Sequence, residues 1–232
     1  MAQRIIDVAG LGPVIFNKRR GGRNLRVTIT GKGQIRVSVP SWLPYRAGVE
    51  FAKHNKAWID EKMSARPDKT LRDGMQIGKS HRLYFIAKSG DTKARLKGTE
   101  IIVSGSLPTT SPKVQKIASA AAEKALKKEA EVLLAQRLKQ LSQKHHLPYS
   151  DYRIRKMTSR WGHCSSKGVI TLSYLLMQLP WHLIDYVLVH ELVHTKEMNH
   201  GPKFWALFQS IEPKAKLLRK EIRQAQPHLM VF

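Results

Sequence analysis

The sequence predicts an α+β protein in which a sheet-rich N-terminal region precedes a mostly helical C-terminal region. Two observations carry this prediction. Apolar and polar residues alternate over much of the first half of the chain, which is the period of a β-strand. Further along, apolar residues recur at the three- and four-residue spacing of an α-helix. We place the boundary at residue 108, so the two regions span residues 1–108 and 109–232.

The N-terminal region begins with a predicted β-hairpin followed by a helix. Apolar side chains alternate over residues 25–29 and 35–39, and a glycine-rich turn lies between the two segments. The pattern then predicts a helix over residues 44–63. Its inward positions are expected to be Val49, Ala52, Trp58, Ile59 and Met63.

Three strand-like segments follow, at residues 82–86, 94–96 and 100–103. They indicate a second sheet element within the N-terminal region. No cluster of chemically reactive residues occurs in residues 1–108, so this half of the sequence does not indicate a substrate.

A long helix is predicted over residues 113–146, which are rich in Ala, Lys, Glu and Leu. Ser106 to Pro112 resembles a linker, and Ser111-Pro112 can cap the helix. One apolar stripe is expected to be core, and its members are Leu126, Ala130, Leu133 or Leu134, Leu138 and Leu141. An amphipathic helix that binds a partner is the alternative.

The pattern H-E-x-x-H occurs at residues 190–194, inside an apolar and helix-periodic run that begins near Pro180. Two histidines four residues apart on a helix are turned by only about 40°, so His190 and His194 can hold one zinc ion. Glu191 lies beside them and can take a proton from a water on the metal without being a ligand. The alternative is that both histidines are hydrogen-bonded in the core or exposed.

A catalytic zinc usually has three protein ligands and an open position, so a third donor is needed. His200 follows His194 by six residues, which is the spacing in the longer motif H-E-x-x-H-x-x-G-x-x-H. The Gly-Pro pair after His200 predicts a fresh helix start that fixes it in the connecting turn. This chain has Glu197 where the motif has glycine, and Glu197 and Glu212 are alternative donors.

The chain resembles the YgjP-like metallopeptidase family in the segments SRWGHCSSKGVITLSYLLMQLP and IDYVLVHELVHTKEMNHGPKFW. This bacterial family of predicted zincins is related in motif to SprT-like and Wss1-like proteins. The resemblance is close over about residues 159–205. It implies a zincin-like helical metallopeptidase domain with one zinc ion, ligands at His190, His194 and His200, and a general base at Glu191.

Residues 169–173 predict a short strand, which we expect to be the edge strand that receives an extended peptide substrate. Val169 and Thr171 lie along it as candidate substrate-binding residues. Arg160 can stabilise charge that develops in the reaction, and Trp161 can form an apolar wall of the cleft. The alternative places Trp161 in the core and Arg160 in an ion pair.

Two other features near the motif favour structural roles. His163 and Cys164 are neighbours in an extended segment, so they point to opposite faces and do not form a nucleophilic dyad. A final helix is predicted from Pro202 to about Gln224. Its apolar residues are expected to pack beneath the metal-binding turn, and they are Phe204, Trp205, Leu207, Phe208 and Ile211.

The composition of the chain indicates its compartment and the kind of partner that it favours. The 232 residues include one cysteine, which excludes an internal disulfide framework and favours a reducing compartment. The first residues lack the apolar core of a secretory signal, and no stretch reads as a membrane span, so we expect a cytoplasmic protein. The formal net charge of +24 favours polyanionic partners such as nucleic acid, although the basic residues are dispersed and no nucleic-acid-binding motif accompanies them.

The leading hypothesis from the sequence is a zinc-dependent metallopeptidase that cleaves peptide or protein substrates with Glu191 as general base. The alternative is a nucleic-acid-associated adaptor with a structural zinc, or a factor that processes DNA-linked proteins. Hydrolysis of a non-peptide amide bond is not distinguished from peptidase activity by the sequence.

Overall fold

The computed structural model describes residues 3–30, 33–64 and 70–225. Its contacts divide the chain into two compact units, Met1–Asp68 and Lys69–Phe232. This division differs from the boundary at residue 108 that the sequence analysis suggested. Residues between 70 and 108 form a sheet whose buried side chains, such as Leu83 and Ile101, share one apolar core with the long helix that follows.

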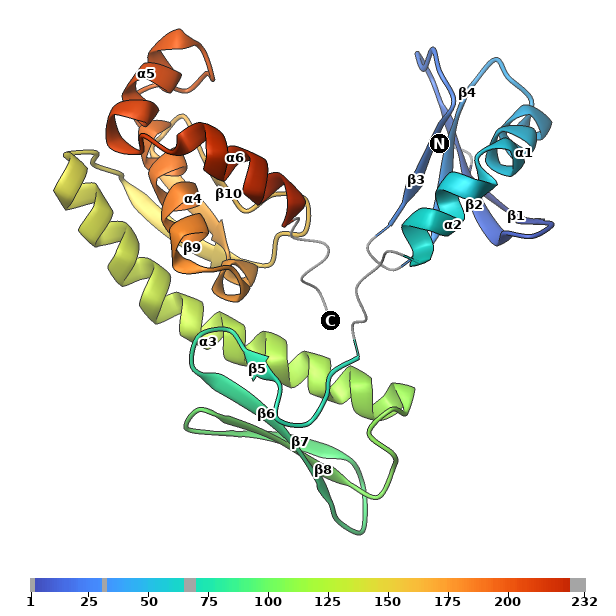
Figure 1. The fold of residues 1–232 in the computed structure, drawn as a ribbon, viewed down its shortest axis with the longest axis horizontal. Coiled ribbons are helices and arrows are strands. Elements are labelled where there is room, and N and C mark those ends of the chain that lie inside the picture. Colours follow the sequence, from blue (N-terminus) through green and yellow to red (C-terminus); the bar gives the residue numbers. More distant parts are fainter. Residues whose placement is uncertain (1–2, 31–32, 65–69, 226–232) are drawn as a thin grey trace. The chain divides into compact units, whose positions relative to one another are not determined.

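The first unit is one mixed sheet with two helices (Figure 1). Its strands run in the order β1-β2-β4-β3. The predicted hairpin is confirmed, because β3 and β4 pair antiparallel with Val27 opposite Val37. The bounds are β1 Gln3–Val8, β2 Gly12–Arg19, β3 Arg26–Ile29, β4 Ile35–Pro40, α1 Tyr45–His54 and α2 Lys56–Ser64.

The segment predicted as one helix over residues 44–63 forms two helices, because the helix is interrupted at Asn55. The side-chain amide of Asn55 donates to the carbonyl oxygen of Phe51 at 2.8 Å, which offers the backbone an alternative partner at the end of α1. Helix α2 buries one side chain, Ile59, as expected. Trp58 and Met63 are 40% and 37% exposed, so the prediction that they face inward is wrong.

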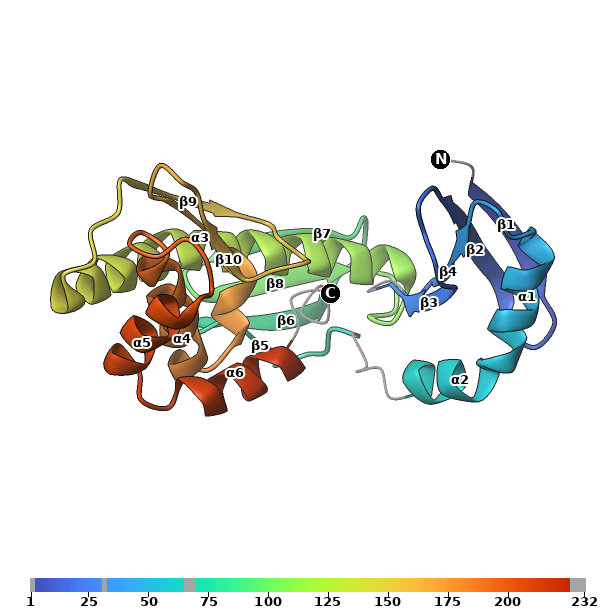
Figure 2. The same cartoon turned by 90° about the horizontal axis from the view of Figure 1, so that it is seen from above.

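The second unit begins with a four-stranded sheet in the order β5-β6-β8-β7, which confirms the three predicted strand segments. Its long helix α3 spans Pro112–His145, and the Ser111 side chain caps its first turn as expected. In Figures 1 and 2, this sheet lies along the N-terminal half of α3, and α4 lies beside the C-terminal half. The strands are β5 Gln76–Ile77, β6 His81–Ala87, β7 Lys93–Lys97 and β8 Glu100–Gly105.

A buried carboxylate ties this sheet to α3. Glu129 accepts hydrogen bonds from the backbone N–H of Lys79 at 2.8 Å and from the backbone N–H and the hydroxyl of Ser80, both at 2.6 Å. Gly78 has a φ of +67°, and a Cβ there would overlap the Glu129 carboxylate. The turn at residues 78–80 therefore needs glycine both for its backbone conformation and for space.

The apolar stripe of α3 is core, as predicted. Leu126, Ala130, Leu134 and Leu138 are fully buried, and Leu141 is 5% exposed.

We expect Leu134→Ala to lower the free energy of unfolding by about 2–5 kcal/mol, because it leaves a cavity among packed side chains. Val132 lies on the same helix with 62% of its surface exposed, so Val132→Ala is the matched control and should stay within about 0.5 kcal/mol. Urea unfolding followed by circular dichroism measures both; equal losses would contradict this packing.

The C-terminal part of the second unit combines a three-stranded sheet with the remaining helices. Strand β11 lies between β10 and β9, so the prediction that residues 169–173 form an edge strand is wrong. The sequence shows that a segment is a strand but not which strands flank it, and here β9 pairs with β11 from nearly twenty residues upstream in parallel register. The strands are β9 Asp151–Arg155, β10 Gly162–Cys164 and β11 Val169–Ser173.

The helices that follow carry and surround the H-E-x-x-H motif. A short 3₁₀ helix, η1 Tyr174–Gln178, leads into α4 Trp181–Val193, which begins after Pro180 as predicted. The single final helix expected to reach about Gln224 is two helices, α5 Pro202–Ile211 and α6 Ala215–Gln224. Pro213 lies between them, and proline interrupts a helix because it lacks an N–H donor. Among residues 3–30, 33–64 and 70–225, no helix has the length and apolar character needed to cross a membrane.

Candidate metal centre

Three histidine side chains converge at the C-terminal end of α4. The Nε2 atoms of His190 and His194 are 3.2 Å apart, those of His194 and His200 are 3.1 Å apart, and those of His200 and His190 are 3.0 Å apart. These three residues are the group in the described chain whose donor atoms could share one metal ion. The structure thus brings together the three residues that the sequence analysis selected as ligands.

The backbone explains the convergence. His190 and His194 lie one turn apart, and α4 ends at Val193, so the chain leaves the helix at the second histidine. The next residues form a tight turn in which Lys196 and Glu197 both donate backbone hydrogen bonds to the carbonyl of Val193, at 3.0 Å each. The turn returns His200 to the first two histidines without a left-handed residue at Glu197, since His146 is the one described non-glycine residue with positive φ.

An aromatic layer from α5 supports the turn, as predicted. The ring of Phe204 is fully buried, and its centroid lies 5.0, 4.6 and 4.7 Å from the ring centroids of His190, His194 and His200. The ring of Trp205 stacks on His200 with 6.1 Å between centroids. This packing fixes the imidazole rings in place and excludes water from one side of the group.

The spacing and protonation of the histidines fit a tetrahedral ion. Nitrogens bound at about 2.0–2.1 Å to one tetrahedral zinc would lie about 3.3 Å apart, close to the separations observed. The Nδ1 of His194 donates to the carbonyl of Glu197 at 3.0 Å, which leaves the Nε2 lone pair free to bind a metal. Burial, with help from neighbouring positive charges, lowers the pKa of His190 to about 3. Burial likewise lowers the pKa of His194 and His200, so all three favour the neutral form that ligates metals.

The two alternative donors lie outside the metal-ligand group. Glu197 supplies its backbone carbonyl to His194, and its carboxylate is not part of the metal-ligand group. The Oε1 atom of Glu212 accepts the backbone N–H of Lys214 at 3.0 Å, at the break between α5 and α6. The arrangement therefore favours His200 as the third donor.

Glu191 lies in a buried position beside the histidine group. The residue is 5% exposed, and burial raises its carboxyl pKa to about 8. The positive charge of Arg160 and a backbone hydrogen bond from Cys164 act in the opposite direction. Its Oε2 atom is buried and has no protein hydrogen-bond partner in the described part of the chain. The unpartnered oxygen is available to a water or a substrate, and the raised pKa makes the carboxylate form of Glu191 a stronger base than an ordinary carboxylate.

Gly162 is a site residue that the sequence analysis missed. A Cβ built on Gly162 would lie 2.8 Å from Glu191 Oε1 and 2.9 Å from its Cγ, so any side chain there would push the carboxyl group away. A glycine inside a strand pattern often marks such a close approach, and this is the feature of the sequence that could have identified it.

We expect Gly162→Ala to lower kcat/KM by about 10- to 100-fold, because a shift of the Glu191 carboxyl disturbs its alignment with substrate. The three atoms nearest to the added Cβ all belong to Glu191 and none to a histidine, so metal content should stay at the wild-type level. Metal analysis and peptide-cleavage rates on the same preparation measure the two effects. Loss of metal together with activity would contradict the assignment of Gly162 to the positioning of Glu191.

A cavity of about 630 Å³ opens beside His190 and Glu191. Arg160 and Trp161 both line it, as the sequence analysis suggested for the cleft. Trp161 is also a packed residue: it is 8% exposed, and its indole N–H donates to the carbonyl of Ala225 at 2.9 Å. Further lining residues that the sequence analysis did not select are Tyr186, Arg219, Ile222 and Arg223.

The other predicted substrate-binding residues lie away from this cavity. Val169 and Thr171 belong to the central strand β11, where both backbone edges are paired with neighbouring strands. Thr171 is also 6% exposed. These two residues therefore cannot receive an added peptide strand, and the correction follows from the position of β11 in the sheet.

His163 and Cys164 behave as expected for neighbours in a strand. Both lie in β10, opposite Thr171 and Ile170 of β11. Burial, followed by the negative charge of Glu191, raises the pKa of the Cys164 thiol. A raised pKa disfavours the thiolate, which is the nucleophilic form of cysteine.

Comparison with known proteins identifies a family for most of the chain. The family model described as "YgjP-like, metallopeptidase domain" matches residues 23–225. Among solved structures, the crystal structure of the metallopeptidase zymogen of Pyrococcus abyssi abylysin is 25% identical, with a TM-score of 0.37 over 40% of this chain and 94% of that chain. The corresponding zymogen structure of Methanocaldococcus jannaschii jannalysin is 19% identical, with a TM-score of 0.36 over 40% and 95%. A search of curated proteins gives no match.

Proposed function

Because the chain belongs to the YgjP-like metallopeptidase family, we propose that it is a zinc-dependent peptidase in which His190, His194 and His200 hold the ion and Glu191 is the general base. Membership in the family establishes a metal-dependent hydrolase. The convergence of three Nε2 atoms within 3.2 Å of one another is the observation that carries the finer proposal.

Zinc is the metal that this donor set favours. Neutral imidazole nitrogens suit zinc better than calcium or magnesium, which prefer oxygen ligands. Three histidines with an open fourth position are one of the ligand sets of catalytic zinc. A structural zinc with four protein ligands, as the adaptor hypothesis requires, would need a fourth donor that the described residues do not supply at this group.

A bound zinc ion would supply Lewis-acid chemistry, because it polarises a carbonyl and makes water more acidic. The residues of the chain account for the proton transfers. The carboxylate form of Glu191 accepts a proton from the attacking water, and the resulting carboxylic acid delivers it to the departing amine. The backbone N–H of Cys164 and the close approach of Gly162 hold that carboxyl group in position.

In this proposal, the strand that receives the peptide substrate is β10 and not β11. Strand β10 pairs with β11 on one side, and it is the outer strand of its sheet in the described structure. It also contacts α4, and Gly162 at its start lines the cavity beside Glu191. An extended peptide added to β10 would therefore run next to the proposed general base. Arg160 and Trp161 remain candidates for the wall of this cleft.

The experiment that tests the peptidase proposal compares metal-free and zinc-loaded protein on a proteome-derived peptide library. We expect cleavage only after zinc is added and loss of cleavage when a chelator removes it, because the open site needs the ion. Mass spectrometry of the new peptide ends detects cleavage of any sequence. A zinc-loaded protein that cleaves no peptide, or a metal-free protein that cleaves as well, would contradict the proposal.

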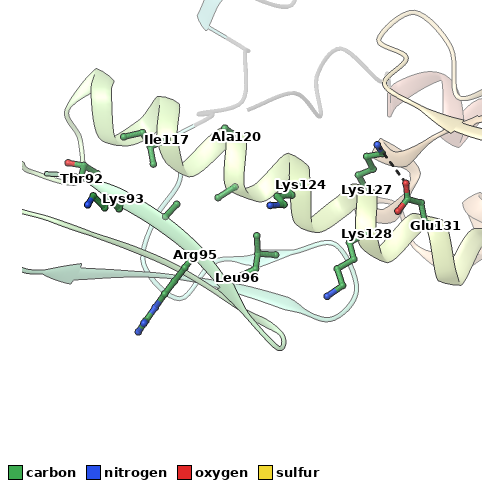
Figure 3. Close-up of a pocket in the computed structure, with 12 residues that line it drawn as sticks. Thr92, Lys93, Arg95, Leu96, Ile117, Ala120, Lys124, Lys127, Lys128 and Glu131 are labelled. Atoms are coloured by element: carbon green, nitrogen blue, oxygen red, sulfur yellow. Dashed lines mark ion pairs between the residues drawn. The ribbon is translucent and has the colours of Figure 1, made fainter.

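We also propose a polyanionic partner, with nucleic acid as the case to test, at a basic groove on the second unit. The groove has a volume of about 950 Å³ and lies between β7 and α3 (Figure 3). Three lysines of α3 line it together with two basic residues of β7, and these are Lys124, Lys127, Lys128, Lys93 and Arg95. The one acidic residue among its lining, Glu131, pairs with Lys127 at 3.7 Å. Such a cluster attracts phosphate backbones.

We expect the combined change of Lys124, Lys127 and Lys128 to Glu to weaken single-stranded DNA binding by about tenfold or more and to reduce its salt dependence. The matched control changes Lys113, Lys116 and Lys139 of the same helix to Glu, since these positions do not line the groove. Fluorescence anisotropy at several salt concentrations measures both variants. Equal effects of the two triple variants, or no DNA binding by the wild type, would contradict this proposal.

A further inference from the structure

Three arginines line the cavity beside the histidine group. Arg160 precedes β10, whereas Arg219 and Arg223 come from α6, far away in the sequence. Glu191 is the one carboxylate among the residues that line this cavity, and the proposed mechanism assigns it to proton transfer. The lining of the cavity therefore carries three positively charged side chains and one carboxylate.

Arg219 is held in a defined position. Its guanidinium carbon lies 4.6 Å from the centroid of the Trp205 ring, in a cation–π contact. The Trp205 ring in turn stacks on His200. This contact is not a hydrogen bond, so the N–H donors of the guanidinium group can still bind an anion. The stacked aromatic rings connect Arg219 directly to the metal-binding turn.

Only one face of α6 contributes to the cavity. Arg219, Ile222 and Arg223 are three and four residues apart, which places them on the same side of the helix. Lys216 and Lys220 are also exposed on α6 but do not line the cavity. The two arginines are thus distinct from the general basic surface of the chain.

Apolar side chains also line the cavity. Trp161, Tyr186 and Ile222 line it together with the arginines. A guanidinium group next to apolar surface binds carboxylates through charge-assisted and often bidentate hydrogen bonds. Positive charge close to a cation site destabilises that site, and an anion bound between them offsets the repulsion.

We propose that Arg160, Arg219 and Arg223 form a substrate subsite that binds a carboxylate of the peptide next to the scissile bond. The carboxylate comes either from an Asp or Glu side chain or from the C-terminus of the substrate. This inference rests on the proposed peptidase function, because it takes the cavity to be the cleft in which the peptide is cleaved.

Peptide binding to the zinc-loaded Glu191→Gln protein tests the subsite without turnover. The probes are short fluorescent peptides in which a single Glu, Gln or Lys is moved along an otherwise fixed neutral sequence, each with a free or an amidated C-terminus. We expect the Glu peptide to bind about tenfold more tightly than the Gln peptide at one position, because one charge-assisted hydrogen bond is gained. If the terminal carboxylate is the ligand, amidation of the C-terminus instead causes the tenfold loss.

Charge reversal at the subsite provides the decisive comparison. Arg219→Glu, in the Glu191→Gln background, should remove the preference for the acidic peptide and favour the Lys peptide. Lys220→Glu makes the same charge reversal one residue away, outside the cavity, and should leave the preference intact. Equal binding of the Glu and Gln peptides together with no effect of amidation, or the same loss of preference in both variants, would overturn the proposal.

The outcomes also separate this inference from the proposed function. Protein with intact Glu191 that binds acidic peptides selectively but cleaves none would refute the peptidase proposal and leave the carboxylate site standing. Protein that cleaves peptides with no preference between Glu, Gln and Lys and no effect of amidation would refute the subsite and leave the peptidase proposal standing.

Discussion

Replacement of Glu191 by Gln is expected to lower kcat by about 100- to 10,000-fold while the protein retains its zinc. The reason is that Gln has nearly the shape of Glu but cannot accept and return a proton, and general acid–base catalysis contributes about this factor. Glu191 does not belong to the group of converging donor atoms, so its loss leaves three imidazoles in place. Zinc content by elemental analysis and kcat on a cleaved library peptide measure the two properties.

Glu191 is buried and closely packed, so a replacement must have nearly the same shape to leave the fold unchanged. Its neighbour Gly162 leaves room for a side chain of this shape, so Gln should fit without a change in the fold. Circular dichroism and thermal unfolding of the zinc-loaded variant provide the control for folding. A Glu191→Gln protein that hydrolyses peptide as fast as the wild type would show that another group accepts the proton.

Replacement of His194 by Ala is expected to weaken zinc binding by more than about 100-fold and to abolish cleavage at ordinary zinc concentrations. His194 supplies one corner of a nearly equilateral triangle of donors, since its Nε2 is 3.2 Å from that of His190 and 3.1 Å from that of His200. Loss of a residue that only orients a ligand already weakens metal binding by about 10- to 100-fold, and a direct ligand contributes more. Competition with a fluorescent zinc chelator measures the affinity.

The matched control is a histidine on the same helix that does not face the group. His182 is exposed near the start of α4 and pairs with Glu221 at 2.8 Å. His182→Ala should retain wild-type zinc affinity. Equal zinc affinity of His194→Ala and the wild type would exclude His194 as a ligand, and a similar loss in both variants would indicate an effect on the helix as a whole.

The sequence predicts the convergence of the three histidines because their geometry is local. His190 and His194 are related by one helical turn, and His200 follows within a short loop whose end is marked by Gly201-Pro202. Periodicity also predicts the apolar stripe of α3 and the strands β3, β4 and β6 to β8. In each case the pattern within a short segment is sufficient to specify the element.

Features that depend on distant segments were not predictable in this way. The central position of β11 follows from its pairing with β9, and no pattern within residues 169–173 encodes that pairing. Arg219 reaches the cavity because α6 packs against α4, and the helix break at Pro213 separates α6 from α5. The packing of α2 against β3 is another such contact, and α2 buries Ile59 but leaves Trp58 and Met63 exposed.

X-ray absorption at the zinc edge of the zinc-loaded protein identifies the atoms bound to the ion. We expect three imidazole nitrogens and one oxygen from water at about 2.0–2.1 Å. The His194→Ala protein should then show fewer imidazole contributions at the same metal loading. A sulfur ligand at about 2.3 Å, or a closed site with four protein ligands, would contradict a catalytic centre built from His190, His194 and His200.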